Sequence, residues 1–240
     1  GRFLTRQGTP WDLMAWSFGA KWGEGGWSTK SVPQLQQEAA IVLSLGGGFQ
    51  AYFTQKRDGS ISRWQMDLMR EVAKFCRDRQ EFCHRGEPVP QIALVYAGKA
   101  FYHQTPRVFA PWHGELDPMR GVLQSLLEAQ LPVEILMEHH LTGHMADYPL
   151  IVVPEWEYLE PGFREELLAY VRDGGHLLVI GPKAAAMFAE QLQVRFTGEL
   201  QEDKVHYLEH NGWLAAMKTP FQAVELGAEA RPFGKLYGEN

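Results

Sequence analysis

The stretch Tyr148–Pro182, YPLIVVPEWEYLEPGFREELLAYVRDGGHLLVIGP, decides the fold. An apolar run at Tyr148–Trp156 precedes a helical segment, and a second apolar run follows at His176–Pro182. Pro161 suits the first turn of that helix, and Gly174 suits its C-terminal stop. The helix should turn its apolar side chains toward the sheet: Phe163, Leu167, Leu168 and Val171. Strand, helix and strand in this order predict two parallel strands joined by a crossover.

The same alternation extends toward the N-terminus. Gln91–Gly98 and the run LPVEILMEH, residues 131–139, are expected to be strands, with a helix at Asp117–Gln130 between them. All these strands are apolar throughout, which is typical of a parallel sheet covered by helices on both faces. Residues 90–193 are therefore predicted to form a small flavodoxin-like, doubly wound α/β domain. Residues 194–240 change to short strand-like pieces and are expected to be an incomplete, β-rich tail.

Another βαβ unit precedes this domain. A strand at Pro10–Phe18 is expected to be buried, and a second strand is expected at Phe49–Gln55. The helix between them should begin at a capping box of Ser31 and Gln34. Its apolar stripe is Leu35, Ala39, Val42 and Leu43. Residues 61–89 should form a connector helix, with a second capping box of Ser62 and Gln65, and a linker.

A βαβ unit of this size cannot bury both faces of a two-stranded sheet. Two arrangements would cover residues 1–60: packing against the second domain, or membership in a larger barrel whose last two strands these are.

The second arrangement agrees with a resemblance. PWDLMAWSF, from Pro10, and QEAAIVLSLGGGFQAYFTQKRDGSI, from Gln37, resemble the end of the (β/α) TIM barrel of glycoside hydrolases related to α-L-fucosidases. The segment after VPQIALVY resembles the glutamine-amidotransferase-like domain that follows the barrel in several glycosidases, such as the β-galactosidase trimerisation domain. The resemblance covers roughly residues 8–190. It implies the C-terminal portion of a glycoside hydrolase that is inactive by itself. Glycosidases of this sort are often exported to the periplasm or beyond, but the sequence leaves the compartment open.

Glycosidases use two carboxylates on either side of the scissile bond. The resemblance implies that the catalytic pair lies upstream of Gly1. Asp12 comes early in its strand and should lie away from the catalytic rim. Glu24 follows the strand and is a candidate acceptor for sugar hydroxyls, or an acid/base; a solvated loop carboxylate is the alternative.

Tryptophans cluster in the same region. Flat rings stack on the C–H faces of sugars and lose little side-chain entropy. Trp16, Trp22 and Trp27 fall at the end of the strand and after it, so we expect them, with Glu24, to bind substrate. Trp11 is expected in the core, and core packing is also the alternative for Trp16.

The second domain is expected to be catalytically silent. Amidotransferase chemistry needs a cysteine at a tight strand-to-helix turn, where this chain has Gly181 and Pro182. Lys99 and Arg107 could meet an anion, but a solvated loop is favoured because one glycine is too few for a phosphate-cradling loop. The role expected instead is packing or oligomerisation.

Histidines raise the question of a metal. His140 and His144 have the i, i+4 spacing of zinc ligands, but Thr142 and Gly143 make a helix doubtful there. A second group precedes residue 117, where docking is favoured over ligand binding; its members are Phe101, Tyr102, His103, Trp112 and His113. We expect no metal and no cofactor.

Bulk properties exclude other classes. The net charge of −6 argues against nucleic-acid binding, and no apolar run is long enough to cross a membrane. Cys76 and Cys83 are expected to be reduced thiols. The expected partners are a carbohydrate, through the parent barrel, and a second copy of the chain. The competing hypothesis is a stand-alone binding or assembly module, which predicts burial of Leu13, Phe18, Val42 and Phe53; the glycosidase fragment predicts their exposure.

Overall fold

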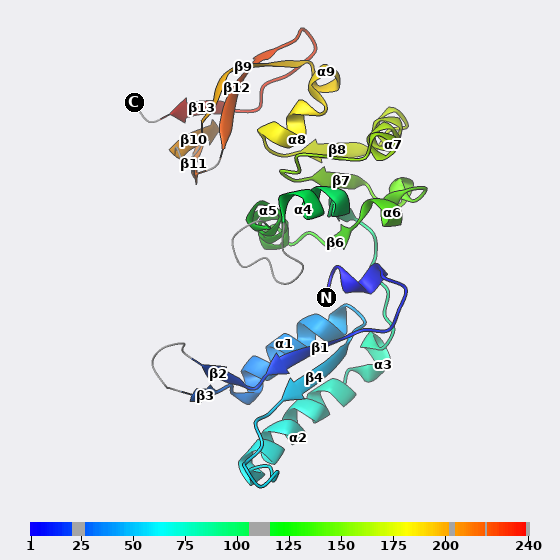
Figure 1. The fold of residues 1–240 in the computed structure, drawn as a ribbon, viewed down its shortest axis with the longest axis vertical. Coiled ribbons are helices and arrows are strands. Elements are labelled where there is room, and N and C mark those ends of the chain that lie inside the picture. The colour runs from blue at the N-terminus through cyan, green and yellow to red at the C-terminus, as the bar shows by residue number, and fades with distance from the viewer. Residues whose placement is uncertain (21–26, 106–115, 202–204, 219, 239–240) are drawn as a thin grey trace. The chain divides into compact units, whose positions relative to one another are not determined.

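The computed structural model describes residues 1–20, 27–105, 116–201, 205–218 and 220–238. The chain forms two compact units, Gly1–Val89 and Pro90–Asn240. Figure 1 shows the elements of both units in chain order. None of the helices in the described part of the chain is long and apolar enough to cross a membrane.

The first unit is built on two parallel strands. Its elements are η1 (Leu4–Arg6), β1 (Asp12–Trp16), β2 (Phe18–Ala20), β3 (Trp27–Thr29), α1 (Val32–Ser44), β4 (Gly48–Tyr52), α2 (Arg63–Arg77) and α3 (Gln80–Cys83). β1 pairs in parallel with β4, from Asp12 opposite Gly48 to Trp16 opposite Tyr52. β2 and β3 form a separate antiparallel pair.

Both capping boxes are confirmed. The backbone N–H of Ser31 donates to Gln34 Oε1 over 2.7 Å, and the backbone N–H of Ser62 donates to Gln65 Oε1 over 3.2 Å. Each box satisfies N–H groups that a helix start leaves unpaired, so α1 and α2 begin where the sequence predicts. The two cysteines are free and half-buried.

α1 and α2 cover the same face of the β1–β4 pair. Ala15, Leu35 and Val72 are buried together, one from the strand and one from each helix, with Phe49 and Phe53 packed around them. The opposite face carries Met14 and Trp16, which are exposed. The prediction of a buried strand at Pro10–Phe18 is therefore wrong for that face, because two strands with helices on one side have nothing to cover the other.

The second unit contains a four-stranded parallel sheet of order β6-β5-β7-β8. Its strands are β5 (Ile92–Val95), β6 (Val133–Leu136), β7 (Leu150–Val153) and β8 (His176–Val179). Its helical segments are α4 (Gly98–Gln104), α5 (Asp117–Glu128), α6 (Glu138–Leu141), η2 (Met145–Asp147), α7 (Pro161–Arg172), α8 (Pro182–Ala186) and α9 (Ala189–Leu192). The predicted strands and long helices of residues 90–193 are thus present.

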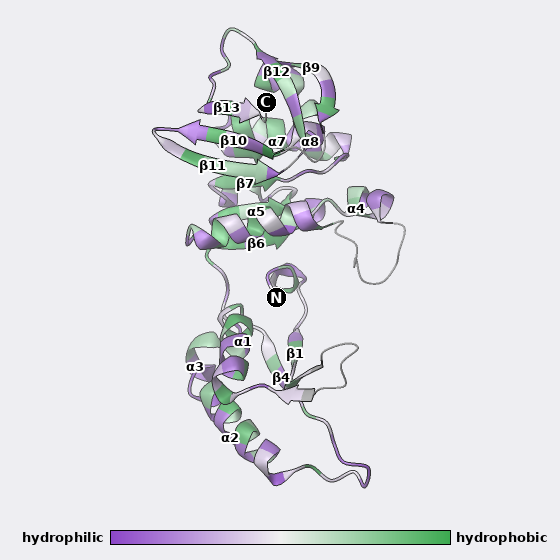
Figure 2. Ribbon diagram, turned by 90° about the vertical axis from the view of Figure 1, so that its left-hand side faces the viewer, coloured by the Kyte–Doolittle hydropathy of each residue, from purple (hydrophilic) through white to green (hydrophobic). Residues whose placement is uncertain are grey.

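Burial differs along this sheet. β5 and β6 are buried at every position and β7 at all but its first, whereas β8 alternates between exposed and half-buried. Figure 2 shows β6 and β7 in the green of hydrophobic residues and α5 with alternating colours. The expectation of two covered faces holds for β5, β6 and β7 and is wrong for β8; edge position alone does not explain the difference, because β6 is also an edge strand.

α7 differs from its prediction at one position. Phe163 and Leu167 are buried as expected, but Val171 is exposed and Tyr170 is buried in its place. The Tyr170 hydroxyl donates to the carbonyl of Tyr148 over 2.7 Å and accepts from the backbone N–H of His176 over 3.0 Å. These bonds turn Tyr170 inward and leave Val171 outside.

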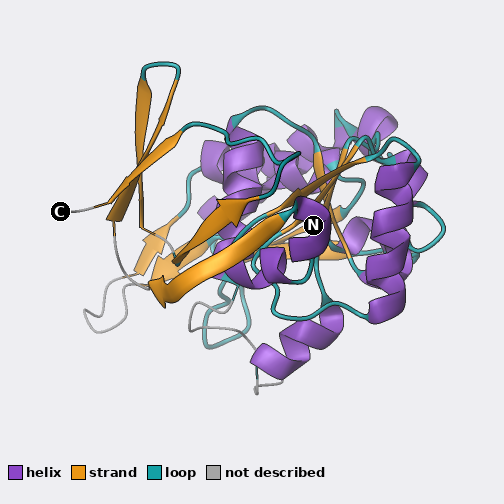
Figure 3. Ribbon diagram, turned by 90° about the horizontal axis from the view of Figure 1, so that it is seen from above, coloured by secondary structure: helices purple, strands orange, loops and turns teal. Residues whose placement is uncertain are grey.

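The C-terminal tail is β-rich, as predicted. It consists of β9 (Val194–Gln201), β10 (Val205–His210), β11 (Trp213–Lys218), β12 (Phe221–Leu226) and β13 (Lys235–Gly238). β9 pairs with β12, and β10 lies between β11 and β13, with all pairings antiparallel. Figure 3 draws the chain close to the C-terminus as strands joined by loops.

Candidate functional site

Three aromatic rings meet at the carboxyl ends of β1 and β4. The ring centroids of Trp16 and Phe18 are 5.3 Å apart, those of Phe18 and Tyr52 5.8 Å, and those of Trp16 and Tyr52 6.4 Å. Trp16 is 57% exposed and Tyr52 42% exposed, whereas Phe18 is half-buried. We call Trp16, Phe18 and Tyr52 the aromatic rim.

Backbone hydrogen bonds hold the rim in place. Ser17 is buried, and its N–H donates to the carbonyl of Tyr52 over 2.9 Å, which extends the pairing one residue beyond β1. Its carbonyl accepts from the N–H of Lys30 over 2.7 Å, which ties the end of the β2–β3 hairpin to the same point. Trp16 and Phe18 therefore flank Ser17, whose backbone N–H and carbonyl are both hydrogen-bonded.

The four predicted substrate-binding residues have different outcomes. The structure places Trp16 in the aromatic rim. Trp22 and Glu24 lie outside the described residues. Trp27 begins β3, opposite Ala20, so the chain forms a hairpin where a loop was expected. The position of the Trp27 side chain lies outside the description as well.

Sequence reasoning missed Phe18 and Tyr52. The signal was present for Tyr52, because it closes the second strand of the parallel pair as Trp16 closes the first. Paired end residues of parallel strands lie side by side on one face. Phe18 gave no such signal, because the sequence predicts one strand that ends at Phe18, whereas in the structure β1 ends at Trp16 and Phe18 begins β2.

Asp12 lies at the other end of β1. Gln50 Nε2 donates to Asp12 Oδ2 over 2.8 Å. Asp12 and Trp16 are four residue steps apart along β1, which is about 13 Å at 3.3 Å per residue. This placement agrees with the expectation that Asp12 stands apart from the rim. The rim itself offers apolar ring faces, and neither Trp16 nor Phe18 carries a group that titrates.

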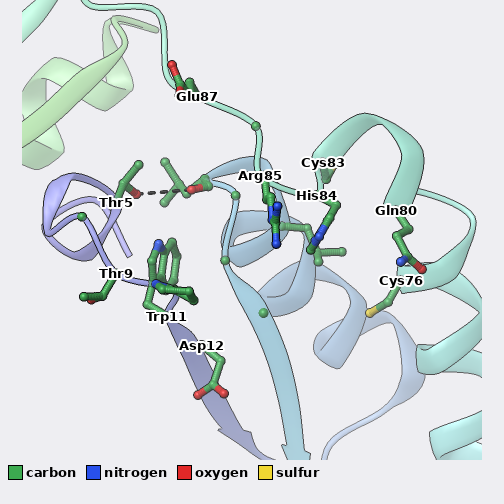
Figure 4. A pocket seen from close by; sticks show the side chains of 18 of the residues that line it. Thr5, Thr9, Trp11, Asp12, Cys76, Gln80, Cys83, His84, Arg85 and Glu87 are labelled. Carbon is green, nitrogen blue, oxygen red and sulfur yellow. Dashed lines mark hydrogen bonds between the residues drawn. The ribbon is translucent and has the colours of Figure 1, made fainter.

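A pocket of about 880 Å³ lies at the amino ends of the two strands (Figure 4). Trp11, His84 and Arg85 line it, together with both cysteines. Trp11 packs on Gly47, where an added Cβ would lie 2.3 Å from a ring atom. The ring packs on Gly47 but is half-buried and lines the pocket, so Trp11 does not lie in the core as expected. Burial raises the pKa of the Cys76 thiol, which favours its protonated form.

Charged groups at the carboxyl edge of the second unit's sheet are paired. Lys99 Nζ lies 2.7 Å from Glu160 Oε1, and Tyr158 donates to the same oxygen over 2.9 Å. The contact with Glu160 raises the pKa of Lys99, and the contact with Lys99 lowers the pKa of Glu160. The alternative of Lys99 as an anion ligand loses support, because its charge is already matched; Arg107 lies outside the described residues.

The strand-to-helix turn after β8 is closed by a carboxylate. Gly181 has φ +92° and precedes α8. Glu155 Oε1 accepts from the backbone N–H of Lys183 over 3.2 Å, and Glu155 Oε2 fills the space beside Gly181. Burial raises the pKa of Glu155. A side chain at position 181 would meet the Glu155 carboxylate.

The histidine groups are also placed. α6 ends at Leu141, so His144 does not share a helix with His140, and within the described ranges no group of His, Cys, Asp and Glu could hold a metal ion. α4 presents Tyr102 to solvent and places His103 near Tyr158, with ring centroids 6.3 Å apart. The other members of the expected docking group, Trp112 and His113, lie outside the description.

No protein-family model matches this sequence, and no curated protein matches it. Solved structures do. The α-L-fucosidase isoenzyme 2 from Paenibacillus thiaminolyticus has a TM-score of 0.74 and 18% identity over 94% of this chain and 34% of its own. Gan42B, a GH42 beta-galactosidase from G. stearothermophilus, has a TM-score of 0.72 and 13% identity over 98% of this chain and 39% of its own.

A beta-galactosidase from Halorubrum lacusprofundi has a TM-score of 0.70 and 12% identity over 95% of this chain and 37% of its own. The chain therefore spans between a third and two fifths of the length of these enzymes. At such low identity the likeness is one of fold, and the fold of this chain is one that glycoside hydrolases contain.

Proposed function

We propose that this chain is the C-terminal portion of a glycoside hydrolase, with β1 and β4 as the last two strands of its catalytic barrel. The observation that carries the proposal is the asymmetry of the first unit. Helices cover one face of a parallel strand pair, and the other face exposes Met14, Trp16 and Tyr52. Strands of a (β/α) barrel have the same two kinds of face. Helices cover the outer face, and side chains from the inner face pack together in the barrel interior.

The aromatic rim then falls on the catalytic side of the barrel. Active sites of such barrels lie at the carboxyl ends of the strands, where Trp16 and Tyr52 stand. We propose that these rings contact the apolar face of a bound sugar. Trp22, Glu24 and Trp27 would form the rest of the same subsite. The two catalytic carboxylates belong to earlier strands. The structural neighbours make a fucoside or a galactoside the first substrates to test.

The exposure test between the two hypotheses gives a mixed result. Leu13 is exposed, Phe18 and Phe53 are half-buried, and Val42 is buried. Exposure of Val42 was a wrong expectation, because Val42 faces inward from α1. The unpaired apolar surface is instead the strand face opposite the helices, which supports the glycosidase fragment over the stand-alone module.

For residues 90–193 we propose a non-catalytic, flavodoxin-type domain of the amidotransferase-like kind. The strand order β6-β5-β7-β8 is the doubly wound order 2-1-3-4 in chain numbering. The filled turn at Gly181 supports a silent domain, and exposed Tyr102 on α4 supports a role in packing or oligomerisation.

The decisive experiment uses the protein as its own host makes it. We expect an intact mass far above the 27.3 kDa of this chain, and hydrolysis of aryl fucosides or galactosides. Trp16→Ala in that protein should lower kcat/KM at least about tenfold, because a stacking surface for the sugar is lost. Trp64→Ala removes an exposed tryptophan from α2 and should leave kcat/KM unchanged. A native mass near 27.3 kDa would refute the proposal.

A further inference from the structure

The hairpin of β10 and β11 presents a tryptophan to solvent. Asn211 and Gly212 form its two-residue turn, with φ of +50° and +82°. Two successive positive φ values are those of a type I′ turn, which matches the twist of paired strands and fixes their register. Trp213 follows the turn directly and is 82% exposed. Its position is therefore set by the backbone rather than by burial.

Two further rings share the face of the sheet that carries Trp213. His210 is the register partner of Trp213, so both side chains leave the same face. Phe233 stacks on His210, with centroids 4.0 Å apart and planes 21° from parallel. Phe233 is itself 71% exposed, so the stack presents a free ring face to solvent. We call Trp213, His210 and Phe233 the three-ring surface.

The surroundings hold these rings in place. Gly234 has φ +72°, and an added Cβ would lie 2.6 Å from the carbonyl oxygen of Glu209, so the chain passes close to β10 directly after Phe233. Asn211 Nδ2 lies 3.0 Å from His210 Nε2, and the N–H of Gly212 donates to Glu209 Oε1 over 3.0 Å. Polar groups therefore border the rings on the turn side.

The rings do not serve the core of the tail. The buried contact on β10 is His206, whose ring lies 4.5 Å from that of Phe221. Trp213 and Phe233 keep most of their surface exposed to water. Folding therefore gains little hydrophobic free energy from these two rings. Large rings held in an exposed, fixed arrangement are typical of a binding surface.

The chemistry favours a neutral ligand with apolar faces and many hydroxyl groups. Ring faces contact sugar C–H groups, and amide, imidazole and carboxylate groups at the border bond hydroxyls. Lys235 is the register partner of Glu209, so a carboxylate residue neighbours this cation on the sheet, which disfavours lipid headgroups and phosphate backbones. We propose that the three-ring surface is a glycan-binding site, distinct from the aromatic rim, that contacts a polysaccharide chain.

The test is affinity electrophoresis of the 240-residue chain through native gels. The gels contain a soluble β-glucan, a galactan, a galactomannan or a fucose-containing polysaccharide. At least one polysaccharide should retard the chain, and Trp213→Ala and Phe233→Ala should weaken the retardation at least about tenfold. Trp213→Tyr keeps a ring and should retain part of it. Trp64→Ala, which removes an exposed tryptophan from α2, should behave as the unsubstituted chain.

Unfolding in urea shows that each variant is folded before it is scored. The proposal is overturned if none of the four polysaccharides retards the chain, or if Trp213→Ala is retarded as strongly as the unsubstituted chain. Sedimentation provides a further check. If the unsubstituted chain self-associates and Trp213→Ala abolishes this without changing retardation, the surface joins copies of the chain and binds no glycan.

Discussion

Glu155 occupies the space that a side chain at position 181 would need. An ideal Cβ on Gly181 would lie 1.0 Å from Glu155 Oε2 and 2.1 Å from Glu155 Cδ. The two residues come from the ends of neighbouring parallel strands, β7 and β8. A carboxylate thus fills the space beside Gly181 at the turn between β8 and α8.

Gly181→Ala should therefore destabilise the chain by about 2–4 kcal/mol. The added methyl displaces Glu155, and alanine is strained at φ +92°. Urea unfolding measures the change. The matched control is Gly162→Ala in α7, where nothing lies within 4 Å of an added Cβ. It should be neutral or stabilising by up to about 1 kcal/mol, because alanine favours helix more than glycine does.

A double substitution separates the two causes. Glu155→Ala in the Gly181→Ala background removes the clash and leaves the backbone strain, so part of the lost stability should return. No recovery at all would mean that Glu155 is not the obstacle.

Glu155 also predicts a pH dependence. Burial, the largest cause, raises the pKa of this carboxyl above its usual 4.5 in the folded chain. A group with a raised folded pKa adds stability below its unfolded pKa and loses that contribution as pH rises through the folded value. Glu155→Gln cannot ionise. The free energy of unfolding of the unsubstituted chain, relative to Glu155→Gln, should therefore fall as pH rises from 4 toward neutrality. A difference that is flat or rising over this window would contradict the raised pKa.

Local signals in the sequence predicted helix starts well. Ser31 and Gln34 bond to each other within four residues, so nothing distant is needed to specify the start of α1. The apolar strands of the parallel sheet were predictable for the same reason. A short, continuous apolar run between turn signals is typical of a buried strand. The parallel pairing of β1 with β4 was predictable from the crossover helix between them, but its register was not.

Partners distant in sequence decided the rest. The burial of β1 could not be predicted, because a run of apolar residues does not show whether other elements cover one face of the strand or both. Phe18 joined the aromatic rim because Ser17 bonds to both Tyr52 and Lys30, a contact that no short motif encodes. Tyr170 replaced Val171 on the inner face of α7 because two backbone groups in other segments accept and donate at its hydroxyl.

The capping box of α1 gives a prediction with a close control. Ser31→Ala removes the hydroxyl that accepts from the N–H of Gln34, over 3.4 Å, and should cost about 1 kcal/mol of unfolding free energy. Ser44→Ala, at the other end of the same helix, removes an exposed hydroxyl that bonds to Ile41 O within the helix. Its effect should stay within about 0.5 kcal/mol. Equal losses in the two variants would show that the cap contributes nothing specific.

Tyr170 provides the sharpest test of the second unit. Tyr170→Phe keeps the ring and removes a hydroxyl that bonds the carbonyl of Tyr148 and the N–H of His176. Two backbone groups lose a partner, so the substitution should destabilise by about 1–3 kcal/mol in urea unfolding. Tyr237→Phe in β13 makes the same chemical change at an exposed ring and should have little effect. Tyr170→Phe and Tyr237→Phe could unfold at the same urea concentration. Water would then replace the lost hydroxyl, and ring packing alone would hold the Tyr170 side chain on the inner face of α7.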